Sequence, residues 1–236
     1  MQAAILAGGL GTRLRPITET VPKAMVPVLG RPFIDYEIDL LKAAGVVDFV
    51  ICVGHLGGMI EQHLGDGGSL GVRIHYSYDG PRLLGPAGAL RRAEKLLGET
   101  FFVTYGDAYL RAPYRRIMNA LVGSGKLGLM TVYMNDNRHG ASDIAVRGGM
   151  VINYDKTNRS RGFRWINFGV TALQRNALKL IPARRGCGEE EFYGSLIARR
   201  QLVAFPVTKR FYEVGTQPSL AEFGRFISRN PPRSFR

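Results

Sequence analysis

Short apolar runs alternate with amphipathic segments along the first 134 residues, and this alternation restricts the fold more than any other feature. The runs have the length of buried strands and lie at residues 2–6, 48–54, 72–78, 100–107 and 127–134. Segments typical of helices lie at residues 32–45, 58–65, 87–98 and 114–123. Strands that alternate with helices predict an α/β fold with a doubly wound, mostly parallel, Rossmann-like sheet.

The alternation ends near Met134, and the second half has a mixed pattern. Residues 143–156 are typical of a hairpin that turns at Gly148 and Gly149. Further strands are expected at residues 162–173, 201–207 and 209–215, and helices at residues 189–200 and 217–228. We therefore expect a smaller mixed α+β region packed on the first half.

Length and composition exclude several classes of protein. The 236 residues suffice for a sizeable core, and no apolar run approaches the ~20 residues of a membrane span. The first apolar run is too short for a signal peptide, so we expect a cytoplasmic protein. The two cysteines are too few for a disulfide scaffold. We expect Cys52 to be a buried free thiol in a strand, and Cys187 to lie in a loop.

The chain is strongly basic, with a net charge of +13 from 32 basic and 19 acidic residues. Such a charge can indicate nucleic-acid binding, but the basic residues are spread out and no aromatic-basic RNA motif or helix-turn-helix signature is present. A positive field also suits an enzyme with phosphorylated substrates. We expect neither a nucleic-acid nor a membrane partner.

The loop LAGGLGTRLRP, residues 6–16, follows the first strand. Ligands of open parallel sheets bind beyond the carboxyl ends of the strands. Glycines there let backbone N–H groups approach an anion or a flat base. Arg13, Arg15 and Lys23 supply permanent charge for phosphate.

Two familiar glycine motifs do not fit this loop. A dinucleotide fingerprint needs G-x-G-x-x-G, and here Gly11 is followed by Thr12, Arg13 and Leu14, so the third glycine is missing. An NAD-dependent dehydrogenase is therefore disfavoured. A P-loop needs Gly-Lys-Ser/Thr, which does not occur in this loop.

The stretch GGLGTRLRPITETVPKAMVPVLGRP, residues 8–32, resembles the signature of the sugar-1-phosphate nucleotidyltransferases, whose pattern runs G-G-x-G-T-R-L-x-P-L-T, three residues, P-K-P. The resemblance covers nearly the whole chain. Further similar segments lie at residues 32–46, 83–93, 101–107, 152–156, 166–173 and 211–223. It implies one nucleotidyltransferase domain, 1–236, with a nucleotide-binding core at 1–134 and a sugar-binding, metal-completing part at 135–236.

The resemblance implies transfer of a nucleoside monophosphate from a nucleoside triphosphate to a sugar 1-phosphate, with release of pyrophosphate. Arg13, Lys23 and Asp107 correspond to catalytic residues: Arg13 holds the β- and γ-phosphates, and Lys23 bridges the α-phosphate and the sugar phosphate. The implied nucleotide-binding residues are Leu6, Ala7, Gly8, Gly9, Gly11, Thr12, Arg13, Gly85 and Gly88.

The same resemblance implies a sugar-phosphate site and a metal site. Lys23, Lys156, Asn167 and Gly169 would contact the sugar phosphate and the sugar. Asp107 and Glu213 would bind Mg²⁺, a hard cation that prefers oxygen ligands. A homodimer remains open as the assembly state.

The chain departs from the family pattern at several positions. Ala24 replaces a proline, Glu213 an aspartate, and Tyr105 the asparagine of the usual NGD; Pro86 stands where a base-reading residue is common. Among compact members the chain is most similar to heptose or mannose 1-phosphate guanylyltransferases, which favours GTP. Uridylyl- or cytidylyltransfer to another sugar 1-phosphate, a catalytically silent nucleotide-sugar-binding regulator and a nucleic-acid-binding module remain alternatives.

Overall fold

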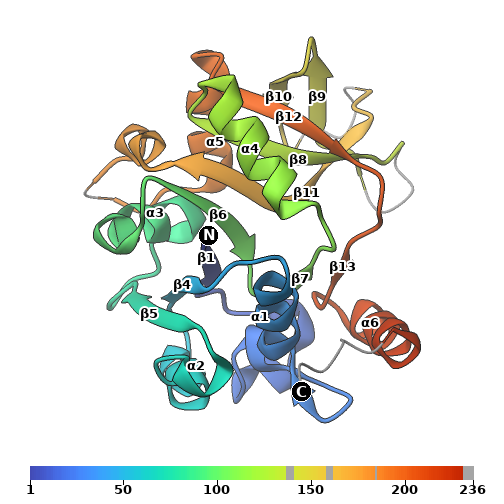
Figure 1. The fold of residues 1–236 in the computed structure, drawn as a ribbon. Helices are drawn as coiled ribbons and strands as arrows, with labels where there is room; N and C mark the ends of the chain where they lie inside the picture. The colour runs from blue at the N-terminus through green and yellow to red at the C-terminus, as the bar shows by residue number, and fades with distance from the viewer. Residues whose placement is uncertain (137–140, 158–161, 184, 231–236) are drawn as a thin grey trace.

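The computed structural model describes residues 1–136, 141–157, 162–183 and 185–230. Within these ranges a nine-stranded sheet has the order β5-β4-β1-β6-β11-β8-β12-β10-β9 (Figure 1). Its strands are β1 (Gln2–Ala7), β4 (Asp48–Val53), β5 (Arg73–Tyr78), β6 (Thr100–Tyr105), β8 (Gly128–Met134), β9 (Ile144–Arg147), β10 (Met150–Tyr154), β11 (Trp165–Gln174) and β12 (Leu202–Val207).

One end of the sheet is parallel, as predicted. β1 pairs in parallel with both β4 and β6, and β5 pairs in parallel with β4. The carboxyl ends of these four strands therefore lie along one edge. The loops that leave this edge include the glycine-rich loop after β1 and the Gly106–Asp107 turn after β6. This edge is the place where parallel α/β sheets bind ligands.

The other end of the sheet is mixed, as expected for the second half of the chain, but it continues the parallel end as one sheet and is not a separate region packed on it. β11 runs antiparallel to both β6 and β8, β10 runs antiparallel to β12 and β9, and β8 and β12 are parallel. β9 also pairs with β11, so the five strands from β8 to β12 form a closed ring. Because β11 is antiparallel, its amino-terminal half lies beside the carboxyl end of β6, and the sheet runs continuously across residue 134.

Helices cover both faces of the sheet, which explains the alternation of apolar side chains. In β1, Ala3 and Ile5 pack in one cluster with α1, α2 and α4, while Ala4 packs in the opposite cluster with α3 and α5. The helices are α1 (Phe33–Ala43), α2 (Gly57–Leu64), α3 (Gly85–Arg92), α4 (Tyr114–Ser124), α5 (Glu189–Ala198) and α6 (Gln217–Arg229). Short 3₁₀ segments are η1 (Thr12–Leu14), η2 (Ile17–Glu19), η3 (Lys23–Met25), η4 (Gly68–Leu70), η5 (Ala93–Leu96) and η6 (Arg175–Leu180).

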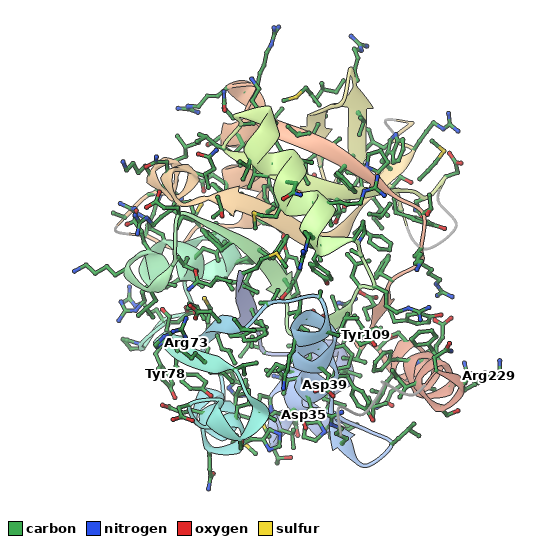
Figure 2. All side chains as sticks on the ribbon, viewed as in Figure 1. Asp35, Asp39, Arg73, Tyr78, Tyr109 and Arg229 are labelled. Atoms are coloured by element: carbon green, nitrogen blue, oxygen red, sulfur yellow. The ribbon has the colours of Figure 1, made fainter. Side chains whose placement is uncertain are left out.

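Two small strand pairs flank the main sheet: β2 (Pro27–Val28) with β3 (Arg31–Pro32), and β7 (Ala108–Tyr109) with β13 (Tyr212–Glu213). A third apolar cluster joins the second pair to α1 and α6, and its centre is the fully buried Phe223. Tyr109, which Figure 2 shows close to α1, packs its ring 5.1 Å from that of Phe223. α6 is therefore an anchor for β13.

The predicted hairpin is confirmed: β9 and β10 pair antiparallel, and Gly148 and Gly149 turn with positive φ. Cys52 and Cys187 are free and buried, Cys187 in a loop. The strand expected at residues 209–215 is shorter, and the 3₁₀ segment η6 was not foreseen. No helix in the described ranges is both long and apolar enough to cross a membrane.

Candidate active site

A cavity of about 360 Å³ opens at the carboxyl ends of the parallel strands. Residues from the first loop, from η3, from the loop before α3 and from the turn after β6 form its wall. They are Leu6, Ala7, Gly8, Gly9, Gly11, Thr12, Arg13, Lys23, Ala24, Cys52, Asp79, Leu83, Gly85, Pro86, Ala89, Tyr105, Gly106, Asp107 and Gly215. We refer to this space as the first cavity.

The glycine-rich loop packs closely against the loop after β4. A Cβ on Gly54 would lie 2.8 Å from the carbonyl oxygen of Gly8, and a Cβ on Gly8 would lie 3.1 Å from the Gly54 nitrogen. Gly11 has a φ of 62° and precedes η1, and the Thr18 hydroxyl donates to its carbonyl at 2.8 Å. Bare backbone therefore forms this wall of the first cavity, as the sequence predicted.

Lys23 and Asp107 meet across the first cavity. Their side chains form an ion pair although 84 positions separate them in the sequence. The Gly106 N–H donates to the Leu6 carbonyl at 3.0 Å, and a Cβ on Gly106 would lie 3.1 Å from that of Ala24. The small residues 24 and 106 thus let η3 approach the turn after β6.

Arg13 lies where the late segment of the chain returns to the site. A Cβ on Gly215 would lie 3.2 Å from an Arg13 guanidinium nitrogen, so the Arg13 side chain packs closely against the backbone of residue 215. The Val214 N–H donates to the Asp107 carbonyl at 2.9 Å, and Glu213 pairs with Ala108. The β7–β13 pair therefore brings Glu213 beside Asp107.

A second cavity, of about 310 Å³, adjoins the first. Arg13, Tyr105 and Asp107 line both cavities. The remaining walls come from β11, from the end of β10, from the start of α5 and from residues near β13. Its further residues are Ala108, Asp143, Lys156, Ile166, Asn167, Phe168, Gly169, Glu189, Phe211 and Glu213.

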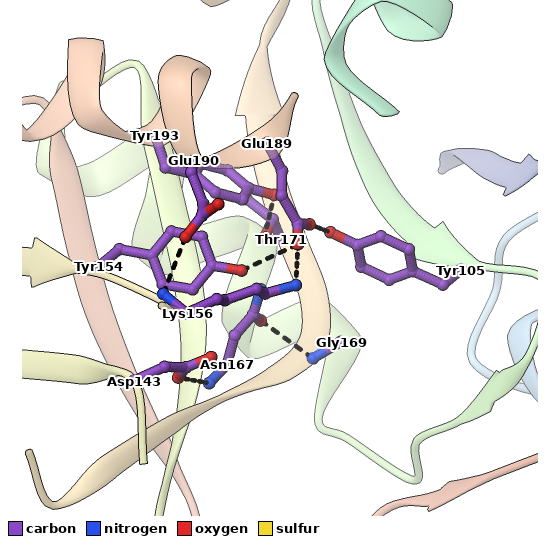
Figure 3. A network of polar contacts seen from close by, with 10 residues as sticks. All are labelled: Tyr105, Asp143, Tyr154, Lys156, Asn167, Gly169, Thr171, Glu189, Glu190 and Tyr193. Carbon is purple, nitrogen blue, oxygen red and sulfur yellow. Dashed lines mark hydrogen bonds and ion pairs between the residues drawn. The ribbon is translucent and has the colours of Figure 1, made fainter. Parts of the chain in front are cut away.

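Glu189, the first residue of α5, is the centre of a polar network in the second cavity (Figure 3). Its carboxylate accepts hydrogen bonds from the hydroxyls of Tyr105 and Tyr154, the latter at 3.0 Å, and pairs with Lys156. The Lys156 N–H donates to Glu190 at 2.8 Å. Burial raises the pKa of Tyr105 well above its usual value, so its hydroxyl stays a donor.

Asp143 fixes the strand that carries Asn167. The Asn167 N–H donates to Asp143 Oδ1 at 3.2 Å, and the Gly169 N–H donates to Asn167 Oδ1 at 3.1 Å. The pairing of β11 with β8 is irregular between Asn167 and Thr171, and the bulge is of the kind that redirects side chains. Burial raises the pKa of Asp143 to about 6, although the bond from Asn167 opposes it.

The structure brings nearly all the predicted site residues to these two adjoining cavities. Gly88 is the exception, because a Cβ there would meet Leu84 and Cys187 and its N–H donates to the Cys187 carbonyl. It permits packing of α3 rather than lining the first cavity. Arg15 is also outside both cavities and lies 4.0 Å from Glu19.

Sequence reasoning missed Asp79, Asp143 and Glu189. Glu189 begins a run of three acidic residues at a helix start, where carboxylates are favourable without any other role. Asp79 and Asp143 each lie next to a predicted strand and are typical of turns. What would have identified these residues is their place at the ligand-binding edge of the sheet. That place follows only from the order of the strands in the sheet, which the sequence does not give.

The residues fit a Mg²⁺ ion as the resemblance implies. Asp107 and Glu213 both line the second cavity and belong to one strand pair. In the described part of the chain no group of three or more metal-binding side chains occurs. Two carboxylates with substrate phosphates and water are an ordinary Mg²⁺ environment.

Residues 2–142 match the protein family described as Nucleotidyl transferase. The chain belongs to the nucleotidyl transferase family. It is 33% identical over 223 residues to mannose-1-phosphate guanyltransferase from Eremothecium gossypii, across 91% of this chain and 61% of that relative. The family predicted from the glycine-rich loop is thereby confirmed.

Two further similarities place this nucleotidyl transferase chain among its relatives. It is 39% identical over 121 residues to UTP–glucose-1-phosphate uridylyltransferase from Synechocystis sp., across 47% of this chain and 31% of that one. The chain therefore spans about a third to three fifths of the length of these two curated relatives. The fold is that of HddC from Yersinia pseudotuberculosis complexed with GMP-PN, at a TM-score of 0.80 and 22% identity, across 96% of this chain and 99% of HddC.

Proposed function

We propose that the protein transfers a nucleoside monophosphate from a nucleoside triphosphate to a sugar 1-phosphate and releases pyrophosphate. The observation that carries the proposal is the pair of adjoining cavities that share Arg13, Tyr105 and Asp107. Glycine backbone lines one cavity, and a lysine, an asparagine and carboxylates line the other. Such a pair suits two substrates that react where the cavities meet.

The chemical difficulty of this reaction is the repulsion between two anions. The sugar phosphate oxygen attacks the α-phosphorus in line with the departing pyrophosphate, so the protein needs to position both groups and neutralise charge. We assign Lys23 to the α-phosphate and the attacking phosphate. Lys23 donates to Asp107 here, and phosphate oxygens are alternative acceptors for the same ammonium. Arg13, which has no ion pair within the described residues, is assigned to the pyrophosphate.

The second cavity is assigned to the sugar 1-phosphate. Lys156 would bind the phosphate, and Asn167 and Gly169 would contact the sugar ring. Glu189 holds Lys156 at this place and offers acceptors to sugar hydroxyls. Asp107 and Glu213 would hold Mg²⁺, which would neutralise phosphate charge.

We propose GTP and a mannose or heptose 1-phosphate as the substrates. The similarity to a mannose-1-phosphate guanyltransferase over 91% of the chain supports this choice. The similarity to a uridylyltransferase is confined to 47% of the chain. Uridylyl transfer to another sugar is therefore the alternative outcome of the assay.

The test is Mg²⁺-dependent pyrophosphate release from a panel of nucleoside triphosphates and sugar 1-phosphates. We expect Lys23→Ala and Asp107→Asn each to lower kcat/KM by about 10²- to 10³-fold, the usual loss for one group that stabilises transition-state charge. Arg15→Ala is the matched control and should stay within about twofold, as for ordinary surface changes. Full activity in both site variants would refute the assignment. Nucleotide binding without pyrophosphate release would indicate a silent binding protein.

A further inference from the structure

Glu37 is a buried carboxyl group that the proposed chemistry leaves unused. It lies on α1 and is 2% exposed. It shares the buried side of the helix with Ile34, Ile38 and Leu41, which pack in the apolar cluster between α1 and the sheet. An acid among such neighbours requires an explanation, because an apolar side chain would fill the place without the cost of burying a polar group.

The end of β6 and the turn that follows it lie next to Glu37. Phe102 packs in the same cluster as α1, and side chains two positions apart on a strand share a face, so Thr104 also faces α1. Burial raises the pKa of Glu37 well above its usual value, contact with the Thr104 hydroxyl opposes this rise, and the charge of Asp107 adds to it. Glu37 therefore lies within range of both Thr104 and Asp107.

Glu37 and Thr104 are suited to be hydrogen-bond partners of one another. In the described ranges both Glu37 oxygens and Thr104 Oγ1 are sealed from solvent, and none has a partner of ordinary geometry. Tyr114 on α4 also lies near Glu37, but its hydroxyl donates to the Leu110 carbonyl at 2.8 Å. An unpaired carboxylate is strongly unfavourable in such a place, so the carboxyl is protonated. A protonated carboxyl can donate to the Thr104 oxygen.

α1 contacts both segments that carry the Lys23–Asp107 pair. η3, which begins with Lys23, packs on α1, and so does β7, which begins directly after Asp107 (Figure 1). The Phe33 N–H at the start of α1 donates to the Val26 carbonyl after η3 at 3.1 Å. Thr104 lies three positions before Asp107. A bond from α1 to Thr104 therefore ties the end of β6 to the same helix that holds η3.

We propose that Glu37 is a positioning residue for the Lys23–Asp107 pair: its uncharged carboxyl donates a hydrogen bond to Thr104 and holds the turn after β6 in place from behind the site. The inference rests on the proposed function, which makes this pair the reactive centre. Glu37 is not among the residues that line either cavity, so it acts through Asp107 and not on the substrates. Its lack of charge matters as well, since a second carboxylate behind Asp107 would repel the phosphates.

The pyrophosphate-release assay separates positioning from packing when it is combined with urea unfolding. Glu37→Met removes the donor, so kcat should fall about tenfold to a hundredfold, since a displacement of about 1 Å can cost a hundredfold in rate. The KM for the triphosphate should change little, because the glycine and arginine contacts remain. Glu37→Gln, the conservative variant, restores an uncharged donor of the same shape and should restore kcat.

The double variant Glu37→Met with Thr104→Val removes both polar groups at once. It should be as stable as the wild type or more stable, because no buried polar atom of the pair is left without a partner. Its kcat should nevertheless stay as low as that of Glu37→Met. A role in packing alone predicts the opposite, a stable double variant with normal kcat.

Tyr36→Phe is the matched control, because Tyr36 precedes Glu37 on α1 and its buried hydroxyl donates to the Val28 carbonyl at 3.0 Å, away from both cavities. It should lower stability and leave kcat unchanged. A normal kcat in Glu37→Met or in the double variant would overturn the proposal, and so would a kcat in Glu37→Gln as low as that in Glu37→Met.

Amide hydrogen exchange of the free protein gives a second readout that needs no turnover. The Gly106 N–H donates to the Leu6 carbonyl at 3.0 Å within the turn that Glu37 holds. This amide should exchange about twofold to tenfold faster in Glu37→Met, the effect of one lost hydrogen bond. It should exchange at the wild-type rate in Glu37→Gln and Tyr36→Phe. Unchanged exchange in Glu37→Met would overturn the proposal. A wild type that releases no pyrophosphate would refute the transfer reaction, and faster Gly106 exchange in Glu37→Met would then still support Glu37 as the residue that holds this turn.

Discussion

Asp143 shows how a single side chain links the second cavity to the stability of the protein. Burial raises its pKa to about 6, from about 4 in the unfolded chain. The native state therefore binds more protons than the unfolded state between these values, so the contribution of Asp143 to stability is present below about pH 4 and falls until about pH 6.

We predict that Asp143→Asn removes this loss of stability with rising pH. Asparagine can accept the same hydrogen bond from the Asn167 N–H and carries no charge. The variant should gain stability over the wild type between pH 4 and pH 6, by up to about 3 kcal/mol, and keep a constant advantage above pH 6. Urea unfolding at unit steps from pH 4 to pH 8 measures the difference. A difference that is flat with pH, or that shrinks as pH rises, would contradict the prediction.

The ends of β1 and β4 show how neighbouring elements shape the first cavity. Ala at Gly54 would place a Cβ 2.8 Å from both the Gly8 carbonyl oxygen and the Leu83 side chain. The two loops would have to separate. We predict that Gly54→Ala weakens nucleotide binding at least about tenfold, since a displacement of about 1 Å can cost as much as a hundredfold in rate. Titration of the variant and of the wild type with the triphosphate measures this difference in affinity.

Gly58→Ala on α2 is the control for this element-level prediction. A Cβ there meets nothing within 4 Å. Alanine should leave nucleotide affinity unchanged and stabilise the helix by up to about 1 kcal/mol. Equal effects of the two substitutions on nucleotide affinity would mean that close packing of the loops does not shape the first cavity.

The elements themselves were largely predictable, whereas their order in the sheet was not. Periodicity placed β1, β4 and β6, because each is a short apolar run between turns. Nothing in the segment 165–174 shows that β11 runs antiparallel to β6, because an antiparallel strand and a parallel strand can have the same apolar pattern. Direction follows from long-range pairing, as at Thr171 and Val103.

The candidate site likewise contains some residues that the sequence predicted and others that it did not. Arg13, Lys23 and Asp107 were recognised because they stand in motifs next to strand ends. Glu189 carries no such local signal, since its contact with Tyr105 joins positions 84 residues apart. Asp79 became visible through its place beside Gly8 in the wall of the first cavity. A sequence motif identifies the residues of one loop, whereas the packing of the folded chain identifies the residues that contact them.

At the scale of the whole molecule, the continuous sheet and the net charge act together. The sheet joins the parallel strands to the mixed strands without a break, so the two cavities open on one continuous layer. The charge of +13 surrounds this layer with a positive field. Such a field attracts polyanions over distances set by ionic strength and raises their association rate.

We predict that added salt screens this field and thereby lowers kcat/KM for the triphosphate. Raising ionic strength from about 0.01 M to about 0.1 M shortens the Debye length from about 30 Å to about 10 Å. The kcat/KM for the triphosphate should fall several-fold, about the loss expected when steering is screened, while kcat changes less. Inhibition by guanosine, which is uncharged, is the control and should be nearly constant. A salt-independent kcat/KM would show that local contacts at Arg13 and Lys23, and not the overall charge, govern capture of the triphosphate. A parallel fall for guanosine would show that salt acts on the protein itself and would contradict the steering explanation.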